Sequence, residues 1–213
     1  MKTVYEQADF FVIDKPSGIS VHNEPGSDLV SRLAEQFSTP VYAIHRLDRY
    51  TSGVLLCTNS SGMVSKLQSA LSNSKKQYLA IVRGVMSSQA GEWDYRITDK
   101  SEGRRNPQGI KKYRKEARTS YKVLDSNQYF SCLSLTLHSG RQHQIRKHCA
   151  MAGHEILGDT RYGDKNYQKK MKQRYGFEGF LLHAHRLQFS YGGAEYDFSC
   201  SPTGWDRVGF SGF

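Results

Sequence analysis

The sequence lacks long hydrophobic runs, and none of its apolar stretches approaches the ~20 residues that a membrane-spanning helix needs. Its N-terminus also lacks the unbroken apolar core of a secretory signal, because Glu6, Asp9 and Asp14 interrupt it. Mean hydropathy is −0.63, with 38% hydrophobic residues, so the folded surface must be strongly polar. We therefore exclude a membrane span and expect a soluble, cytoplasmic protein.

Closely spaced cysteine pairs and internal repeats are also absent. None of the four cysteines, Cys57, Cys132, Cys149 and Cys200, belongs to a Cys-x-x-Cys motif, which disfavours a zinc knuckle or a redox motif. Because no export signal is apparent, we expect these thiols to be free rather than paired in disulfides. A length of 213 residues without repeats indicates one domain, or one domain with two lobes.

What the sequence has in excess is positive charge. Thirty lysines and arginines against twenty aspartates and glutamates give a net charge of +10 and a pI near 9.4. This balance favours a polyanionic partner such as nucleic acid, although a merely soluble basic protein is compatible with it. Much of the charge lies in the segments 104–118 and 164–176, both expected to be loops, in which Tyr113, Tyr167 and Tyr175 offer stacking surfaces.

The pattern of apolar residues predicts strands in hairpin-like groups with few helices between them. Helical spacing occurs at 27–37, 62–71 and 141–152, and Gly153 stands where the last of these helices should stop. Residues 86–118 change character and predict a loop or hairpin excursion. Strands are expected in the segments FFVIDK, VYAIHRL, TSGVLLCT, QYLAIVRG, YKVLD, YFSCLSLTLH, FLLHAHRLQFSY and EYDFSCS. We therefore predict an α+β fold with a mixed, largely antiparallel sheet and flanking helices.

The segment HRLDRYTSG, residues 45–53, places Asp48 in a polar turn between two apolar runs. Turns mounted on a rigid sheet commonly carry catalytic groups. Gly53 allows a close backbone bend, while Arg46 and Arg49 surround the single carboxylate with positive charge. Taken alone, however, the segment is better explained by a carboxylate that caps the turn and pairs with a neighbouring arginine.

The segment SGRQHQIRKHCAMAGH, residues 139–154, predicts a basic helix. Gln142 and Arg146 would share one face, and Ile145 and Cys149 would pack inward from another. The plain alternative is a solvated basic helix. A metal site is disfavoured, because His143, His148 and His154 are spaced by five and six residues rather than by the four of a helical zinc pair.

Several motifs together resemble the RluA-type pseudouridine synthases. HRLDRYTSGVLL is similar to the family signature, DKPSGISVHNEPG to its first motif, and KKQYLAIVRG to its Lys-x-Tyr-x-Ala strand. GRQHQIRKHCAMAGHEILGDTRYG resembles the family's Gly-Arg-x-His-Gln-Ile-Arg helix with the Gly-Asp motif that follows, and FLLHAHRLQF resembles its closing strand. These motifs occur in the family's order over roughly residues 8–200.

The resemblance implies a role for each matching residue. Asp48 matches the catalytic aspartate, Tyr78 the aromatic residue that stacks on the target base, and Arg146 the arginine that pairs with the aspartate. Ile44, Arg46, Arg141 and Leu182 (or Leu181) would bind substrate or shape the site, and Lys111, Lys112 and Arg114 of the basic excursion would contact RNA.

The implied activity is isomerisation of a uridine in structured ribosomal or transfer RNA, in an active-site cleft across the sheet. The reaction breaks the N-glycosidic bond, turns the base and rejoins it through carbon, so it requires no metal or other cofactor. We expect one catalytic domain over 1–213, without a separate N-terminal RNA-binding module, acting as a monomer. A noncatalytic RNA-binding or ribosome-associated protein with the same fold is the alternative; a metal-dependent hydrolase is disfavoured by the histidine spacing.

Overall fold

The computed structural model describes residues 2–177 and 179–212 and divides the chain into two compact units. The first unit comprises 1–76 and 183–202, and the second comprises 77–182 and 203–213. The chain passes from the first unit to the second inside strand β5 (Lys75–Arg83) and returns inside strand β9 (Leu182–Tyr191).

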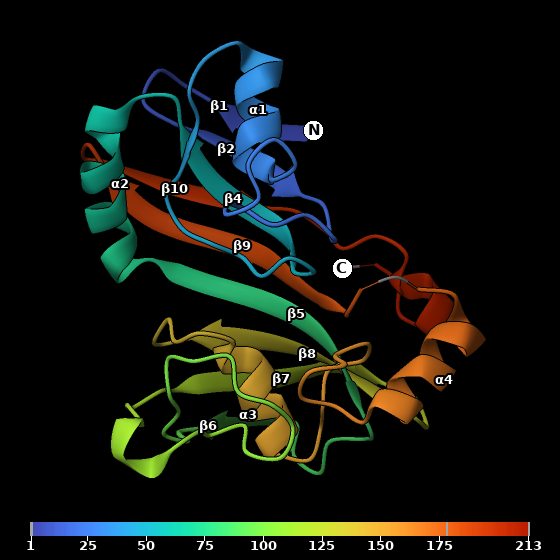
Figure 1. Ribbon diagram of the computed structural model, residues 1–213. Coiled ribbons are helices and arrows are strands. Elements are labelled where there is room, and N and C mark those ends of the chain that lie inside the picture. The colour runs from blue at the N-terminus through green and yellow to red at the C-terminus, as the bar shows by residue number, and fades with distance from the viewer. Residues whose placement is uncertain (1, 178, 213) are drawn as a thin grey trace. The chain divides into compact units, whose positions relative to one another are not determined.

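The sheet of the first unit contains the strands that flank the Asp48 turn. Its order is β1 (Lys2–Glu6), β2 (Phe11–Lys15), β4 (Ser52–Thr58) and β9; β10 (Ala194–Ser199) pairs with β9, and β3 (Tyr42–Ala43) pairs with β4 (Figure 1). β4 and β9 run parallel, whereas β1–β2, β2–β4, β3–β4 and β9–β10 are antiparallel. Asp48 therefore lies in the connection that leads into a central strand.

The two faces of this sheet bury alternate residues of each strand. Val12 and Val54 belong to a hydrophobic cluster that includes Leu67 of helix α2 (Val64–Ala70). The neighbouring Phe11 instead packs edge-on against Phe37 of helix α1 (Leu29–Phe37), with ring centroids 5.3 Å apart. α1 is the predicted first helix, and the side chain of Asp28 caps it by accepting a hydrogen bond from the Ser31 amide at 2.9 Å.

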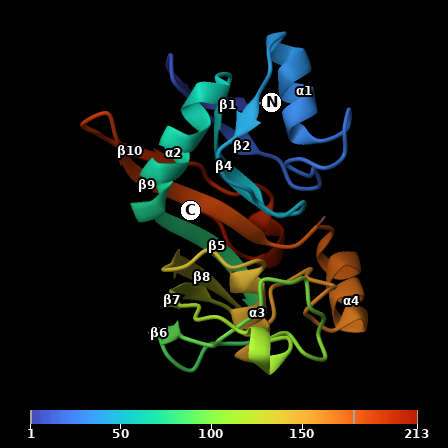
Figure 2. The same ribbon diagram turned by 60° about the vertical axis from the view of Figure 1, so that its left-hand side comes forward.

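The sheet of the second unit has the order β5, β8 (Phe130–Leu137), β7 (Thr119–Ser126) and β6 (Ala90–Trp93), and β6–β7 and β7–β8 are antiparallel. On one face Ala80, Val82 and Leu133 form a cluster with Ile145 and Cys149 of helix α3 (Gln144–Met151). Figures 1 and 2 both draw α3 against β7 and β8. Helix α3 is thereby fixed to the sheet by its inward face, as predicted.

The other face of strands β5 and β8 is covered by helix α4 (Lys165–Tyr175) and by the turn at 205–208. The prediction of a loop at 164–176 is therefore wrong. Asp164 caps α4 by accepting from the Tyr167 amide at 2.9 Å, and Gly176 ends it in the left-handed conformation. Tyr167, Met171 and Tyr175, at four-residue spacing, pack on the core, so Tyr167 and Tyr175 serve packing rather than an exposed stacking surface.

Further sequence expectations can be compared with the structure. The expected α+β class, a mixed and largely antiparallel sheet with flanking helices, is confirmed. The expected strand at 41–47 is reduced to the two residues of β3, and the excursion 86–118 contains the unpredicted strand β6. All four cysteines are free thiols. None of the helices within the described residues combines the length and the apolar composition that a membrane span requires.

Candidate active site

The turn that carries Asp48 is held by backbone hydrogen bonds at its base. The Thr51 amide donates to the Asp48 carbonyl at 3.1 Å, and Leu47 anchors the turn in the hydrophobic interior of the first unit. Asp48 itself is half-buried, while Arg46 and Arg49 are exposed. The carboxylate is thus mounted on a short, fixed connection into β4.

A second segment of the chain clamps this turn. The ammonium of Lys15 donates to the carbonyls of Pro16, Ile19 and Arg49 at 2.8, 2.8 and 3.0 Å. The Gly18 amide also donates to the Arg49 carbonyl, at 2.9 Å. The first sequence motif, which begins DKPSG, therefore fixes the backbone directly after Asp48.

Lys15 is a fully buried cation, and its charge is part of the environment of Asp48. Burial lowers the pKa of Lys15 to about 7, and the negative charge of Asp48 opposes that shift. Three carbonyl acceptors match the three N–H donors of an ammonium group. Sequence reasoning missed Lys15 as a site residue, although a lysine at the end of an apolar strand was a visible signal.

Gly53 allows β4 to approach β9 closely. Gly53 pairs with Ala184, has a φ of +113°, and would place a Cβ only 2.2 Å from the Ala184 carbonyl oxygen. Beside it, the hydroxyl of Ser52 lies 2.8 Å from Nδ1 of His183. The expected close backbone bend at Gly53 is present, and glycine is required there on steric grounds.

Asp14, His183 and Cys200 form a compact group of side chains that could in principle hold a metal ion. His183, however, engages Ser52 through Nδ1 and lies 2.9 Å from the Cys200 carbonyl through Nε2. Burial raises the pKa of the Cys200 thiol to about 12, with the charge of Asp14 acting in the same direction. An imidazole engaged at both nitrogens favours a hydrogen-bonded cluster over a metal site.

Ile44 also lies in the first unit, on the residue after β3. Its side chain is buried in the same cluster as Val54 and Leu56, and its amide donates to the Leu56 carbonyl at 2.9 Å. The next residue, His45, accepts from the Leu56 amide through Nε2, and burial lowers its pKa to about 3. Ile44 is therefore a core residue that positions the Asp48 turn.

Arg146 lies in the second unit on the first turn of α3, and its guanidinium forms a buried ion pair with Asp159. Nε donates to Oδ2 at 2.7 Å and Nη2 donates to Oδ1 at 3.0 Å, with side-chain exposures of 8% and 1%. The guanidinium carbon also lies 4.5 Å from the ring centroid of Phe180 and 5.1 Å from that of Tyr162. This arrangement fixes the orientation of Arg146 by a fork-to-carboxylate contact and two aromatic faces.

Residues 144–149 of α3 are all buried, so the alternative of a solvated basic helix is wrong. Lys147 and His148 are fully buried; the ammonium of Lys147 donates to the carbonyls of Thr98 and Lys100, each at 2.8 Å. The helix begins at Gln144, because His143 adopts the left-handed conformation with φ of 55°. The expected shared helical face of Gln142 and Arg146 therefore does not exist.

Tyr78 and Leu182 belong to the hydrophobic cluster of the second unit that also holds α3. Leu182 is buried in it together with Phe180, and the half-buried ring of Tyr78 packs against the cluster. Leu181 points to the opposite cluster, where it packs with Leu157. Of the two leucines considered from the sequence, Leu182 is thus the one that shares a cluster with Tyr78.

The remaining predicted residues lie in or beside the excursion. Lys111 and Lys112 are exposed on a single helical turn, and Arg114 donates to the Gly109 carbonyl through Nε and Nη2 at 2.9 and 2.7 Å. Arg141 forms an ion pair with Asp99 at 3.5 Å and so ties the excursion to the start of α3.

The predicted site residues therefore form two groups. Asp48, Ile44 and Arg46 belong to the first unit, whereas the others, Tyr78, Lys111, Lys112, Arg114, Arg141, Arg146 and Leu182, belong to the second. Sequence reasoning missed Asp159, although it quoted the Gly-Asp motif that contains it. A carboxylate thirteen positions after an arginine on a different element offers no periodic signal, so only the motif itself could have found it.

Comparison with known proteins places these features in a family. A family model described as RNA pseudouridylate synthase matches residues 9–151. The tRNA pseudouridine synthase C of Haemophilus ducreyi is 33% identical over 207 residues, covering 88% of this chain and 84% of that protein. The ribosomal large subunit pseudouridine synthase C of Buchnera aphidicola is 32% identical over 200 residues, covering 87% and 62%.

Solved structures share the fold. Human RNA Pseudouridylate Synthase Domain Containing 1 has a TM-score of 0.78 at 22% identity, covering 94% of this chain and 82% of that one. Human RNA Pseudouridylate Synthase Domain Containing 4 has a TM-score of 0.77 at 24% identity, covering 97% and 92%.

Proposed function

The chain belongs to the RNA pseudouridylate synthase family and is an isomerase of that kind, and we propose that it converts specific uridines of structured transfer or ribosomal RNA through Asp48. The observation that carries the assignment of Asp48 is the clamp on its turn by Lys15 and Gly18. Such a clamp is expected where a carboxylate must be held in one place. The family assignment argues against the noncatalytic alternative.

In this proposal Asp48 acts on the ribose of the target uridine, either as the nucleophile or as the base. An ionised carboxylate is needed in both cases. Arg146 is proposed to pair with Asp48 and to keep it charged and aimed. This role is supported by the fixed orientation of the Arg146 guanidinium, whose Nε and Nη2 groups donate to Asp159.

Tyr78 is proposed to stack on the uracil, a contact worth about 1–3 kcal/mol per base. Its half-buried ring packs on the same cluster as Leu182, which supports a rigid apolar wall for the detached base. The target uridine must leave its stack to reach such a site, which is easiest from loops and other single-stranded RNA. Arg46 and Arg141 are exposed or half-exposed cations suited to backbone phosphates.

We also propose that the two units together form one catalytic domain, with the active-site cleft across the sheet. The reaction exchanges one bond of the base for another without redox change, so the proposed enzyme works without a metal or other cofactor. We propose that it does so as a cytoplasmic monomer, as expected of an enzyme whose substrate is cellular RNA.

The experiment is a comparison of Asp48→Asn with the wild type on unmodified transfer and ribosomal RNA transcripts. We expect the variant to fold, to bind RNA as the wild type does and to form no pseudouridine, because the amide can neither attack the ribose nor take its proton. Asp206→Asn, an exposed carboxylate of the second unit, is the matched control and should retain full activity. Product formation by Asp48→Asn near the wild-type rate would contradict the assignment.

A further inference from the structure

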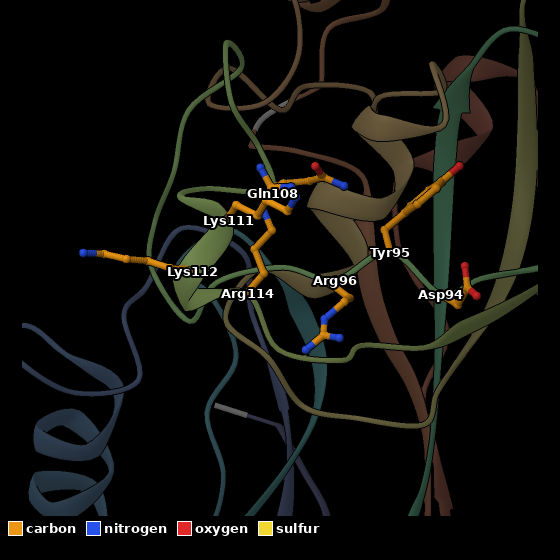
Figure 3. A pocket seen from close by; sticks show the side chains of 7 residues that line it. All are labelled: Asp94, Tyr95, Arg96, Gln108, Lys111, Lys112 and Arg114. Atoms are coloured by element: carbon orange, nitrogen blue, oxygen red, sulfur yellow. The ribbon is translucent and has the colours of Figure 1, made fainter.

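The excursion of the second unit encloses a pocket that the catalytic roles above do not use. Its volume is about 460 Å³, and we call it the basic pocket. It is lined by Asp94, Tyr95, Arg96, Gln108, Lys111, Lys112 and Arg114. Figure 3 shows Gln108, Lys111 and Arg114 gathered at one end, with Asp94 at the other end and Arg96 between them, its guanidinium directed away from Gln108. Positive charge therefore concentrates at one end of the pocket.

The walls of the basic pocket are held in place rather than left as a solubilising loop. Ile97 and Lys115 exchange backbone hydrogen bonds at 3.0 and 2.8 Å, which closes the base of the excursion. The fully buried Lys147 holds the carbonyls of Thr98 and Lys100. These bonds fix the segment 98–100, whose Thr98 amide in turn donates to the carbonyl of the pocket-lining Gln108 at 3.0 Å, so this side of the excursion is held in place.

Helix α3 supports the pocket from a second side. Nε2 of the buried His148 lies 3.1 Å from the Tyr95 carbonyl, and the Tyr95 ring packs edge-on against the imidazole at a centroid distance of 5.7 Å. Lys147 and His148 directly follow Arg146 on this helix. The same rigid element thus carries the proposed partner of the catalytic carboxylate and the supports of the basic pocket.

The cations of the pocket have little internal neutralisation. Within the described part of the chain, no carboxylate forms an ion pair with Lys111, Lys112 or Arg114. Arg96 forms an ion pair with Glu116 at 4.0 Å, with both side chains largely exposed. An exposed pair of that length contributes little. Like charges gathered around one pocket repel each other, and an anion that enters it relieves that repulsion.

We propose that the basic pocket binds a backbone phosphate of the substrate RNA, an inference that rests on the proposed function and adds a defined anchor to it. Lys111 and Arg96, which both line the pocket, contact the phosphate oxygens, and the Gln108 amide donates a further hydrogen bond. Arg114 holds the Gly109 carbonyl and so fixes the turn that presents Gln108 and Lys111. Asp94, at the far end, is placed to accept from a ribose 2′-hydroxyl.

The test is the RNA affinity of the double variant Arg96→Ala/Lys111→Ala, measured over a range of salt concentrations with an unmodified transfer RNA transcript. We expect binding to weaken by roughly tenfold. The plot of log affinity against log salt concentration should become less steep by about one to two units, because fewer counterions are released on binding when phosphate contacts are lost. KM should rise while kcat stays near the wild-type value, since neither residue lies on the catalytic turn.

Lys122→Ala is the matched control, because Lys122 is an exposed lysine on β7 of the same unit outside the basic pocket. It should leave affinity within about twofold. An unchanged salt slope in the double variant, or an equal loss in Lys122→Ala, would overturn the pocket assignment while the wild type still forms pseudouridine. Failure of the wild type to form pseudouridine on any transcript would instead overturn the proposed function, and the binding measurements would still decide the pocket.

Discussion

The ion pair between Arg146 and Asp159 provides the sharpest test of how the second unit is held together. In Asp159→Asn the side chain keeps its shape but loses its charge, and one oxygen becomes an N–H donor that faces the guanidinium. The wild-type carboxylate accepts two hydrogen bonds from Arg146 and two more from the amides of Arg161 and Tyr162, at 2.9 and 3.2 Å. One replacement therefore disturbs both an ion pair and a turn.

The expected loss of stability follows from burial. The side chains of Arg146 and Asp159 are 8% and 1% exposed, so Asp159→Asn removes a carboxylate partner from a guanidinium that is largely out of reach of water. Breaking such a buried pair costs about 3–5 kcal/mol. For a chain of this size each kcal/mol corresponds to roughly 2–4 °C, which predicts a melting temperature about 6–20 °C below the wild type.

This loss can be measured by urea unfolding followed by tryptophan fluorescence. Trp93 and Trp205 both lie in the second unit, which also contains Arg146 and Asp159. Glu155→Gln is the control. Its side-chain ion pair with Arg83, at 3.0 Å, is partly open to water, with exposures of 13% for Glu155 and 45% for Arg83, so less than about 1 kcal/mol should be lost. A loss below about 1 kcal/mol in Asp159→Asn would refute the structural role given to this pair.

The same variant also tests the proposed catalytic role of Arg146. If Asp159 orients the guanidinium for Asp48, kcat should fall by about a hundredfold at a temperature where the variant is folded, because small misplacements of reacting groups cost that much. KM should change little. Normal kcat in a destabilised variant would leave Asp159 a purely structural residue.

Two further predictions concern the first unit. Gly53→Ala should lose more than about 3 kcal/mol of stability or fail to fold, because its Cβ would lie 2.2 Å from the Ala184 carbonyl oxygen. The control, Gly103→Ala, should be tolerated because there is open space around Gly103. Similar denaturation curves for the two variants would contradict this reasoning. For Lys15, whose pKa falls from 10.5 to about 7, the unfolded state binds more protons between these values, so wild-type stability should rise with pH over that window. Circular dichroism at several pH values should find that slope reduced in Lys15→Met, and an unchanged slope would contradict the assignment.

The sequence was most informative where a single local pattern carries the information. Helix α1 is recognisable from Asp28 and the four-residue spacing of Leu29, Leu33 and Phe37, because capping and amphipathic spacing act within a few residues. Helix α4 has the same kind of signal in Asp164 and Gly176, but its many lysines favoured a loop. Its packed side, Tyr167 to Tyr175, is explained only once strands β5 and β8 are present to receive it.

By itself, the sequence determined the family, the α+β class and the candidate carboxylate, because ordered motifs need no knowledge of packing. Only the tertiary structure decided that Lys15 clamps the turn of Asp48, that Asp159 holds Arg146, and that Lys147 anchors the wall of the basic pocket. Each of these is a buried charge whose partner comes from a different element. A buried charge needs a hydrogen-bonded partner because its removal from water is costly. Which groups are removed from water depends on the fold, so the sequence contains no periodic pattern that would identify the partner.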